Sequence, residues 1–575
     1  MTFKLRRRPQ ADDSFLPADI PARLRQIYAS RGIQHVDELN RSAGNLLAPQ
    51  DLKGLPQALA LLTGALQQQQ RIVIVGDFDC DGATSTALMV LALRAMGAQH
   101  VAYLVPNRFE YGYGLSPEIA LLAAQQNAEL LITVDNGISS IAGVETARQQ
   151  GMKVLITDHH LPGTELPQAD AIVNPNQPGC QFGSGNLAGV GVAFYLMAAL
   201  KSHLQQQGWF AQQNIVAPNV ADYLDLVALG TVADVVALDN NNRILVHQGL
   251  QRIRAGRCRA GIKALCEVAG RDLSRLTASD LGFSVGPRLN AVGRLDDMTM
   301  GIACLLANDE HIARHLASQM DSLNQERKAI EGNMQQEAQA ALSRLKALDG
   351  ELPAALVLHQ DDWHQGVVGL VASRIKEQYH RPVFAFAEAG EDELKGSGRS
   401  IPGLHMRDAL ERLDQLHPGL ICKYGGHAMA AGLSLPKACL APFRERFTAL
   451  VADWLTPDQL TGTILTDGEL FPQEFSLEMA EVLRNAGPWG QAFPEPSFDG
   501  IFRLRHQRLV GSKHLKMEVE VPNGPCLDAI AFNVDLARWP DASVGQVQLV
   551  YRLDINEWRG QRSVQLLVEQ LVAVR

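Results

Sequence analysis

The sequence predicts an α/β protein whose first half contains a doubly wound parallel sheet. Apolar runs at residues 72–75, 130–134 and 153–157 have the length and composition of fully buried strands. The stretches at residues 117–126 and 141–150, between these runs, have the composition of helices. Because strand and helix patterns alternate along the chain, the strands are expected to be parallel, with helices on both faces of the sheet.

Three acidic residues follow the first predicted strand on alternate positions. They are Asp77, Asp79 and Asp81, and a helix is expected to begin near Gly82. Open α/β sheets bind their ligands at the carboxyl ends of the strands, so this segment is a candidate site. Carboxylates this close repel one another unless a cation lies between them, and hard divalent ions such as Mg²⁺ or Mn²⁺ prefer oxygen ligands. A solvated acidic loop or an Asp-rich helix cap is the alternative.

Polar side chains also follow three other apolar runs, at residues 130–134, 153–157 and 223–229, the last predicted as a further strand. Since strand ends converge in a doubly wound sheet, these side chains are expected to meet. Several carboxylates with one or two imidazoles fit Mn²⁺ or Mg²⁺ better than structural Zn²⁺. The residues are Asp135, Asp158, His159, His160 and Asp234.

The composition is typical of a large intracellular protein. A chain of 575 residues with 46% hydrophobic residues is expected to form three or four domains. No apolar stretch is long enough to span a membrane, and the basic start has no apolar core of a secretory signal. The eight cysteines are scattered without a CxxC pair, which suits reduced thiols and predicts a cytoplasmic location.

Later segments predict three further regions. Residues 308–348 are largely free of Gly and Pro and are expected to form one long helix. A second α/β unit follows, with strands at 352–358 and 382–387 and a helix at 366–379, and the last part has short β-like runs typical of a small barrel. The predicted domains are a helical extension (1–50), a metal-binding domain (51–270), a connector with the long helix (271–350), the second α/β domain (351–455) and the barrel (460–575).

Several segments resemble known motifs in the same order. Residues 76–82 (GDFDCDG), 134–137 (VDNG) and 157–160 (TDHH) resemble the DHH phosphoesterase superfamily, and residues 396–400 (GSGRS) and 424–427 (YGGH) resemble its DHHA1 companion domain. The segments at 107–114, 287–294 and 323–327 resemble the bacterial single-strand-specific 5′→3′ exonucleases of that superfamily.

The resemblance implies a function and a set of partners. It implies a metal-dependent exonuclease that degrades single-stranded DNA 5′→3′ to mononucleotides in DNA recombination and repair. It also implies a DHH domain, a DHHA1 domain and an OB-fold-like barrel, a 5′-phosphorylated DNA strand as substrate, and a DNA helicase and a single-strand-binding protein as partners. A monomer without membrane contact is expected.

The resemblance further implies a role for each cluster residue. Two ions, Mg²⁺ or Mn²⁺, about 3.5–4 Å apart would activate water and relieve charge on the phosphate. Asp135 would bridge the ions, His160 would face the scissile phosphate, and Asp158 would orient an imidazole. The other ligands would be Asp77 and Asp79 for one ion, and Asp81, His159 and Asp234 for the other.

A terminal 5′ phosphate has more charge than an internal one, so a pocket of Arg and Ser could select it. The candidates are Arg108, Arg288, Ser397, Arg399 and His427. Glycines beside the last three permit close approach to an anion. The alternatives are that these glycines only form turns and that Arg288 forms a structural ion pair.

The net charge of −10 is unusual for a nucleic-acid enzyme, but the location of the charges decides binding. Residues 243–266 contain a basic stretch, for which a solvated face is as good an explanation as DNA contact. A second stretch, residues 501–517, is predicted to contact the phosphate backbone. Its residues are Arg503, Arg505, Arg508, Lys513 and Lys516.

Two other functions remain open from the sequence. One is a phosphoesterase of small substrates, such as cyclic dinucleotides, short oligonucleotides or pyrophosphate, although the basic stretch at 501–517 would then have no purpose. The other is a catalytically silent DNA-binding scaffold, which has no physical need for mutually repelling carboxylates. A zinc hydrolase would require a tighter His and Cys set.

Overall fold

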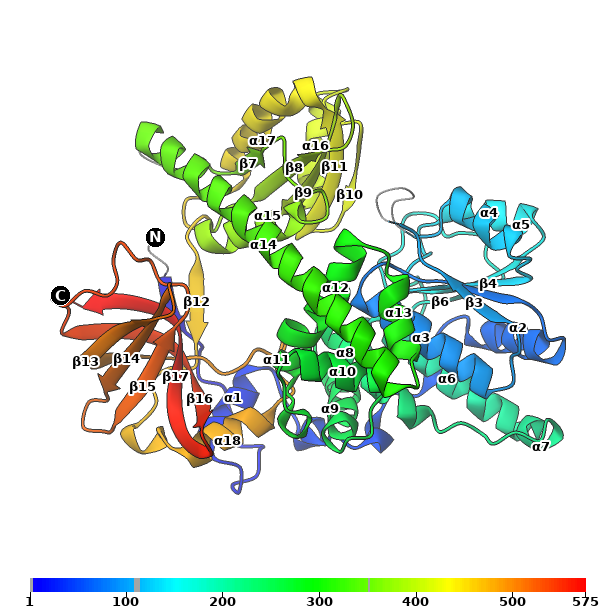
Figure 1. Cartoon of the computed structure of the whole chain (residues 1–575), viewed down its shortest axis with the longest axis horizontal. Helices are drawn as coiled ribbons and strands as arrows, with labels where there is room; N and C mark the ends of the chain where they lie inside the picture. Colours follow the sequence, from blue (N-terminus) through cyan, green and yellow to red (C-terminus); the bar gives the residue numbers. More distant parts are fainter. Residues whose placement is uncertain (1–3, 108–113, 350–351, 575) are drawn as a thin grey trace. The chain divides into compact units, whose positions relative to one another are not determined.

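The computed structural model describes residues 4–107, 114–349 and 352–574. The chain divides into two compact units (Figure 1). The large unit consists of Arg7–Asp321 and Leu465–Arg575, and the small unit consists of Met1–Arg6 and Ser322–Ile464.

The large unit contains the predicted parallel sheet. All its neighbouring strands are parallel, in the order β3-β2-β4-β5-β6. The chain passes from β2 outward to β3 and then crosses back to β4, so the direction of winding reverses between β2 and β4. Ligands of open α/β sheets bind at this switch point. The strands are β2 (Ile72–Val75), β3 (Val101–Leu104), β4 (Leu130–Val134), β5 (Lys153–Thr157) and β6 (Ala171–Val173).

Helices cover both faces of this sheet, which confirms the doubly wound prediction (Figure 1). On one face, α4 and α5 pack against Val73, Leu131 and Val154 in a continuous hydrophobic core. On the other face lie α3 and α6, which contact each other and the sheet. The helices are α2 (Leu55–Gln67), α3 (Cys80–Ala95), α4 (Pro117–Gln125), α5 (Ile141–Gln149), α6 (Gly189–Gln206) and α7 (Trp209–Gln212).

The prediction of a strand at 223–229 is wrong. These residues belong to helix α8 (Leu224–Ala233), and Asp234 is its C-cap residue. Every residue from Leu224 to Thr231 is buried, so the helix shows no polar face. A short run that is apolar on all sides has no periodicity that would distinguish a buried helix from a buried strand.

A helical region follows α8 in the large unit and leads into the predicted long helix. That helix, α14 (Glu310–Asp349), begins in the large unit and continues into the small one. A π-helix, η6, immediately precedes α12. The elements are α9 (Asn240–Arg254), α10 (Ala260–Val268), α11 (Ala278–Asp280), η6 (Leu281–Val285), α12 (Gly286–Leu295) and α13 (Thr299–Leu306).

The predicted helical extension at residues 1–50 has only one α-helix among its described residues, α1 (Ala22–Ser30), besides the strand β1 (Lys4–Arg7) and short 3₁₀ turns. Pro17 and Pro21 precede α1 and prevent a longer helix. This segment pairs with late parts of the large unit. Arg31 forms a buried ion pair with Asp467, and the Tyr28 hydroxyl donates to the Ala486 carbonyl at 2.9 Å.

The small unit has a mixed sheet in the order β10-β11-β9-β8-β7, in which only β7 and β8 are parallel. Phe384, Phe386, Phe443 and Phe447 form the centre of its core. The elements are β7 (Leu356–His359), α15 (Val368–Tyr379), β8 (Val383–Glu388), β9 (Glu393–Arg399), α16 (Met406–Leu416), β10 (Lys423–Gly426), β11 (Ala430–Pro436) and α17 (Leu440–Trp454). The strand β12 (Thr463–Thr466) follows at the end of this unit along the chain and pairs with β1 in a separate two-stranded sheet.

The last part of the chain is a closed five-stranded barrel, which confirms that prediction. Its strand order is β13-β14-β15-β17-β16, and β15 and β17 are parallel. Within the described ranges, no helix has both the length and the apolar character needed to cross a membrane. The elements are α18 (Leu477–Ala486), β13 (Phe498–Val510), β14 (His514–Glu520), β15 (Cys526–Ala531), β16 (Gln546–Trp558) and β17 (Gln561–Val574).

Candidate metal centre

Acidic side chains meet at the switch point of the parallel sheet. Asp77 follows β2, Asp135 follows β4, and Asp158 and His159 follow β5. Asp77, Asp135 and Asp158 are buried. Asp234 joins them from the end of α8 rather than from a strand. The convergence expected from the sequence is therefore present, although one of its members arrives from a helix.

The amino terminus of α3 positions Asp79 and Asp81. Asp79 is the N-cap residue, and its side chain accepts a hydrogen bond from the Gly82 amide at 3.0 Å. Asp81 lies in the first turn and is buried, and its carboxylate accepts from the amides of Gly189 (2.6 Å) and Val190 (2.9 Å). These amides begin α6, so the positive end of that helix holds the Asp81 carboxylate.

The side chain of Asp135 lies so close to Gly189 that position 189 has no space for a side chain. A Cβ atom built on Gly189 would lie 2.6 Å from Cβ and 2.7 Å from Oδ1 of Asp135. Asp135 itself has a φ angle of 61°, in the left-handed region that few residues other than glycine adopt. The backbone is therefore strained at this position, and α6 can approach Asp135 this closely only because residue 189 has no side chain.

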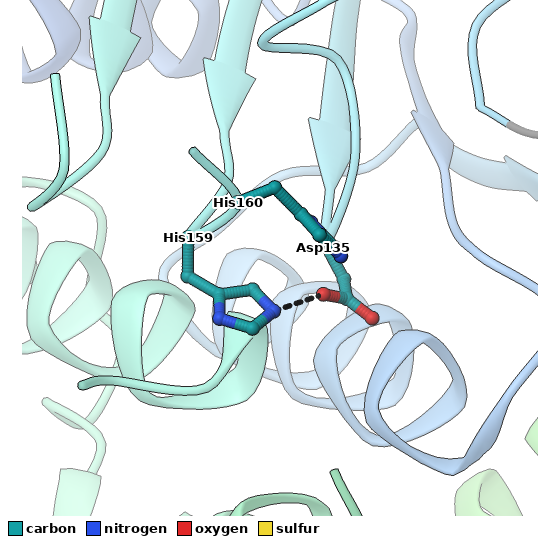
Figure 2. A group of neighbouring side chains, drawn as sticks. All are labelled: Asp135, His159 and His160. Atoms are coloured by element: carbon teal, nitrogen blue, oxygen red, sulfur yellow. Dashed lines mark ion pairs between the residues drawn. The ribbon is translucent and has the colours of Figure 1, made fainter. Parts of the chain in front are cut away.

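His159 faces three of the carboxylates. Its Nε2 atom lies 3.0 Å from Oδ1 of Asp135 and 3.5 Å from Oδ2 of Asp234, and Figure 2 marks the first of these ion pairs with a dashed line. Oδ2 of Asp81 is 3.9 Å away. The side chain is 11% exposed, so the imidazole is nearly enclosed by acidic groups.

His160 is held by Asp158. Its Nδ1 atom lies 2.7 Å from Oδ1 of Asp158, whose other oxygen accepts from the Ile138 amide at 2.9 Å. Burial alone would lower the pKa of His160, but the hydrogen bond and charge of Asp158 outweigh it and raise the pKa. For Asp158, burial alone would raise the pKa, but the hydrogen bond and charge of His160 outweigh burial and lower the pKa. The two groups thus form a fixed pair.

The donor set fits divalent cations. Ligand atoms within 4.8 Å of one another form three overlapping groups: Asp77, Asp79 and Asp135; Asp81, His159 and Asp234; and Asp135, His159 and His160. Carboxylate oxygens with imidazole nitrogens are the donors of Mn²⁺ and Mg²⁺ sites.

The electrostatics of the cluster agree with this fit. Burial, and then the charge of Asp79, raise the pKa of Asp81 to about 7. Burial, and then the charge of Asp81, raise the pKa values of Asp135 and Asp234 well above the ordinary range. Negative charge is therefore unfavourable here without a cation, which is the condition that a bound divalent ion relieves.

The residues predicted to bind a 5′ phosphate belong to both units. Arg108 lies outside the described residues. Arg288, in the large unit, forms an ion pair with Asp321 at 2.7 Å and donates to the Ser284 carbonyl. Its side chain is 12% exposed, so in this structure the guanidinium takes part in an internal contact.

The other three residues lie in the small unit. Arg399 donates to the hydroxyl of Ser397 at 3.0 Å and, through Nε, to the hydroxyl of Ser373 at 3.2 Å. A Cβ atom on Gly369 would lie 2.9 Å from both Nη2 of Arg399 and Oγ of Ser397. His427 is exposed, and its amide donates to the carbonyl of Ala430, the residue that pairs with Arg399 across β9 and β11. The structure thus brings these three residues to one end of β9.

The basic residues predicted to bind DNA lie on β13, on β14 and in the turn between them. Arg505 pairs with Glu520 at 2.5 Å and Lys516 with Asp528 at 2.8 Å, both toward the neighbouring strand. Arg503, Arg508 and Lys513 are exposed. The stretch is basic but partly compensated by acidic residues on the adjacent strands.

Several residues that shape the site were not predicted from the sequence. The amides of Gly189 and Val190 hold Asp81, and Oδ1 of Asn290 accepts from the Cys80 amide at 2.8 Å. A Cβ on Gly230 would lie 2.9 Å from Oδ1 of Asp81. The small residues at 188–191 were a detectable signal of close helix packing, whereas nothing near Asn290 in the sequence indicates its contact with α3.

This sheet with its cluster of metal ligands defines the class of DHH phosphoesterases. The model of the DHH family, N-terminal domain, matches residues 71–231. The DHHA1 domain matches residues 352–456, and the RecJ OB domain matches residues 466–570. These ranges are those of the family matches, and the domain boundaries expected from the sequence remain predictions.

Full-length relatives narrow the class to one family. The chain is 61% identical over 569 residues, 99% of each chain, to the single-stranded-DNA-specific exonuclease RecJ of Dickeya dadantii (strain 3937). It is 59% identical over 570 residues, again 99% of each, to the protein of that name from Escherichia coli (strain K12). The crystal structure of RecJ in complex with Mn²⁺ from Thermus thermophilus matches all of this chain and 80% of that chain, with 29% identity and a TM-score of 0.79. The chain belongs to the RecJ family.

Proposed function

We propose that this chain is a metal-dependent exonuclease that degrades single-stranded DNA from the 5′ end to mononucleotides, in DNA recombination and repair. The observation that supports it most directly is the cluster of buried carboxylates and His159 at the switch point. Relatives that share 56–61% of its residues along 95–99% of its length have the name single-stranded-DNA-specific exonuclease. Both the chemistry of the cluster and the family therefore favour phosphodiester hydrolysis.

Two ions, Mn²⁺ or Mg²⁺, are the proposed cofactors. Asp77 and Asp79 would hold one ion, and Asp81, His159 and Asp234 the other, with Asp135 shared between them. This division is supported because the ligand atoms of Asp77, Asp79 and Asp135, and those of Asp81, His159 and Asp234, lie within 4.8 Å of one another. When bound, such ions act as Lewis acids toward the phosphate and lower the pKa of water.

The protein's own groups fix the geometry around these ions. The amides of α6 keep Asp81 in place, and Gly189 allows α6 to lie against Asp135. Asp158 accepts the hydrogen bond from Nδ1 of His160, which sets the tautomer and leaves Nε2 as the atom that would contact the scissile phosphate. His160 is 32% exposed, more than His159, which agrees with a role toward substrate.

Recognition of the chain end is proposed to involve Arg108, Arg288, Ser397, Arg399 and His427. A doubly charged terminal phosphate accepts more hydrogen bonds from guanidinium and hydroxyl groups than an internal phosphate. Arg399 supports this role because Ser397 and Ser373 already fix its orientation.

We further propose that the barrel contacts single-stranded DNA through Arg503, Arg505, Arg508, Lys513 and Lys516. By family resemblance, a DNA helicase and a single-strand-binding protein are the proposed partners, and the chain acts as a monomer at the nucleoid in the cytoplasm.

The test is digestion of single strands labelled at the 5′ or the 3′ end, alone or as blunt duplexes, with Mn²⁺, Mg²⁺ or EDTA. Stepwise release of mononucleotides from the 5′ end of single strands, only with metal and not by Asp135→Ala, is the expected result. Binding without cleavage would favour the scaffold, and turnover limited to dinucleotides or pyrophosphate would favour the small-substrate phosphoesterase.

A further inference from the structure

Helix α12 packs against α3, whose start carries two of the proposed metal ligands. A hydrogen bond joins the two helices, because Oδ1 of Asn290 on α12 accepts from the Cys80 amide at 2.8 Å. Cys80 lies between the proposed ligands Asp79 and Asp81. The bond therefore acts on the backbone that carries these carboxylates, although Asn290 is 210 residues away along the chain.

The Cys80 amide needs an acceptor from outside its own helix. Cys80 is the first residue of α3, so its N–H group has no partner within the helix. The side chain of Asp79, the N-cap residue, accepts from the Gly82 amide instead. Without Asn290, the Cys80 amide would compete with a cation for the neighbouring carboxylates. Asn290 supplies a neutral oxygen, so it satisfies this amide without adding charge to groups that already repel one another.

A second contact of α12 reaches the same segment. A Cβ atom on Gly293 would lie 1.7 Å from the carbonyl oxygen of Phe78, the residue between Asp77 and Asp79. From the side of α3, a Cβ on Gly82 would lie 2.5 Å from the carbonyl oxygen of Asp77. Residues 77–79 are thus in close backbone contact with both helices, and neither contact leaves space for a methyl group.

Helix α12 is itself fixed on α8. A Cβ atom on Gly286, the first residue of α12, would lie 3.1 Å from Cβ of Ala233. Ala233 is the last residue of α8 and directly precedes the proposed ligand Asp234. The same helix is therefore packed beside ligands of both proposed groups.

The two groups differ in what else supports them. Asp81 also accepts from two amides at the start of α6, at 2.6 and 2.9 Å, so α6 holds it independently of α12. The two contacts of α12 act on residues 78 and 80, on either side of Asp79. Loss of these contacts is therefore expected to affect Asp77 and Asp79 more than Asp81.

We propose that Asn290 is a positioning residue of the metal centre. Together with Gly293, it holds residues 77–80 in the conformation in which Asp77 and Asp79 face one common ion. This inference rests on the proposed function and adds to it an asymmetry. One ion site depends on α12, and the other depends on α6.

The test is titration of the full chain with Mn²⁺ in the absence of DNA, with free Mn²⁺ measured by electron paramagnetic resonance. The wild type should bind two ions. In Asn290→Ala one ion should bind at least about 10-fold more weakly and the other as in the wild type. Asn290→Asp keeps the acceptor oxygen and should restore the affinity. Asn290→Leu has a similar size but no acceptor, and it should behave like Asn290→Ala.

Gly293→Ala tests the second contact and should weaken the same ion. Its matched control is Gly261→Ala on α10, whose Cβ would lie 2.2 Å from the carbonyl oxygen of Cys304 on α13. This clash also involves a backbone carbonyl, but none of the proposed metal ligands. Gly261→Ala should therefore lose stability, measured by thermal unfolding in EDTA, and bind both ions as the wild type does.

Hydrolysis of single-stranded DNA gives a second readout. In Asn290→Ala the Mn²⁺ concentration for half-maximal hydrolysis should rise about 10-fold, and excess Mn²⁺ should restore most of the rate. Reduced hydrolysis at an unchanged Mn²⁺ dependence would assign Asn290 to the substrate and overturn the inference.

Two further outcomes would overturn the inference alone. One is equal binding of two ions by Asn290→Ala and the wild type. The other is full affinity in Asn290→Leu, which would show that packing and not the hydrogen bond supports the site. Wild-type protein that binds no Mn²⁺ and degrades no single strands would overturn the proposed function itself.

Discussion

The parallel sheet of the large unit and the mixed sheet of the small unit gather side chains of opposite charge at their strand ends. The first gathers buried carboxylates at its strand ends, where their pKa values are raised, and the second places the half-buried Arg399 beside hydroxyl groups at the end of β9. The carboxylates repel one another, whereas Arg399 already has its hydrogen bonds. The proposed cation site is therefore built at a cost in stability, whereas the side chains of the proposed anion site are already held by hydrogen bonds.

The largest effect is expected from a variant that disrupts the proposed cation site. Asp135→Asn should reduce hydrolysis of single-stranded DNA by at least about 1000-fold, because it removes the carboxylate shared by two ligand groups. In EDTA the variant should be as stable as the wild type or more stable, because it removes one of several repelling charges. Addition of Mn²⁺ at about 100 times its Kd should stabilise the wild type by about 2.7 kcal/mol and the variant by less, measured by thermal unfolding. Equal stabilisation of both proteins would contradict the proposed ligand set.

The second effect tests whether α6 fixes the cation site. Gly189→Ala should reduce both metal affinity and stability, the latter by about 1–3 kcal/mol, because its Cβ would overlap Asp135. The matched control is Gly64→Ala on α2, which has open space around it and should gain about 0.5–1 kcal/mol. Metal titration and denaturant unfolding measure both. An active Gly189→Ala would show that Asp135 has more freedom than its contacts indicate.

A smaller effect is expected from a variant beside Arg399 in the proposed anion site. Gly369→Ala should displace the guanidinium of Arg399 and the hydroxyl of Ser397 from their present hydrogen bonds, and should change stability little because both are ends of side chains that can shift. The expected result is an increase of about 10-fold in KM for 5′-phosphorylated strands with little change for 5′-hydroxyl strands, since a charged hydrogen bond contributes about 1.5–3 kcal/mol. Gly332→Ala, on α14 with nothing near its Cβ, is the control. An equal change for both kinds of strand would argue against end recognition by Arg399.

The smallest effect concerns the barrel. A triple variant with Gln at Arg503, Arg508 and Lys513 should reduce the slope of log K against log salt by about 2, because each basic residue that no longer neutralises a phosphate lowers the slope by about 0.7. Fluorescence titration of single-stranded DNA at several salt concentrations measures the slope. An unchanged slope would identify this stretch as a solvated basic face.

The strand-end residues could be predicted because their pattern is local. Each buried strand is a short apolar run, and Asp77, Asp135 and Asp158 follow such runs directly. The chemistry of mutually repelling carboxylates then predicts a cation. The same reasoning placed Asp234 in the cluster but assigned a strand to residues 223–229, because helix α8 is buried from Leu224 to Thr231 and has no amphipathic period.

Other parts of the site depend on distant contacts and could not be predicted. The amides of Gly189 and Val190 reach Asp81 from 108 and 109 residues away along the chain. Oδ1 of Asn290 reaches the amide of Cys80 from 210 residues away. Such residues become visible only when the fold brings separate segments together.

The contact between the first segment of the chain and the barrel region has a consequence for synthesis. Arg31 pairs with Asp467, 436 residues further along the chain, and Tyr28 pairs with Ala486, 458 residues further. At about 5–20 residues per second, a ribosome needs roughly 20–90 s to make the residues between Arg31 and its partner. During that time α1 lacks the partners that Arg31 and Tyr28 contact in the folded chain. The segment around α1 is thus synthesised long before its partners at Asp467 and Ala486. A chaperone that binds nascent chains would have that interval in which to bind this segment.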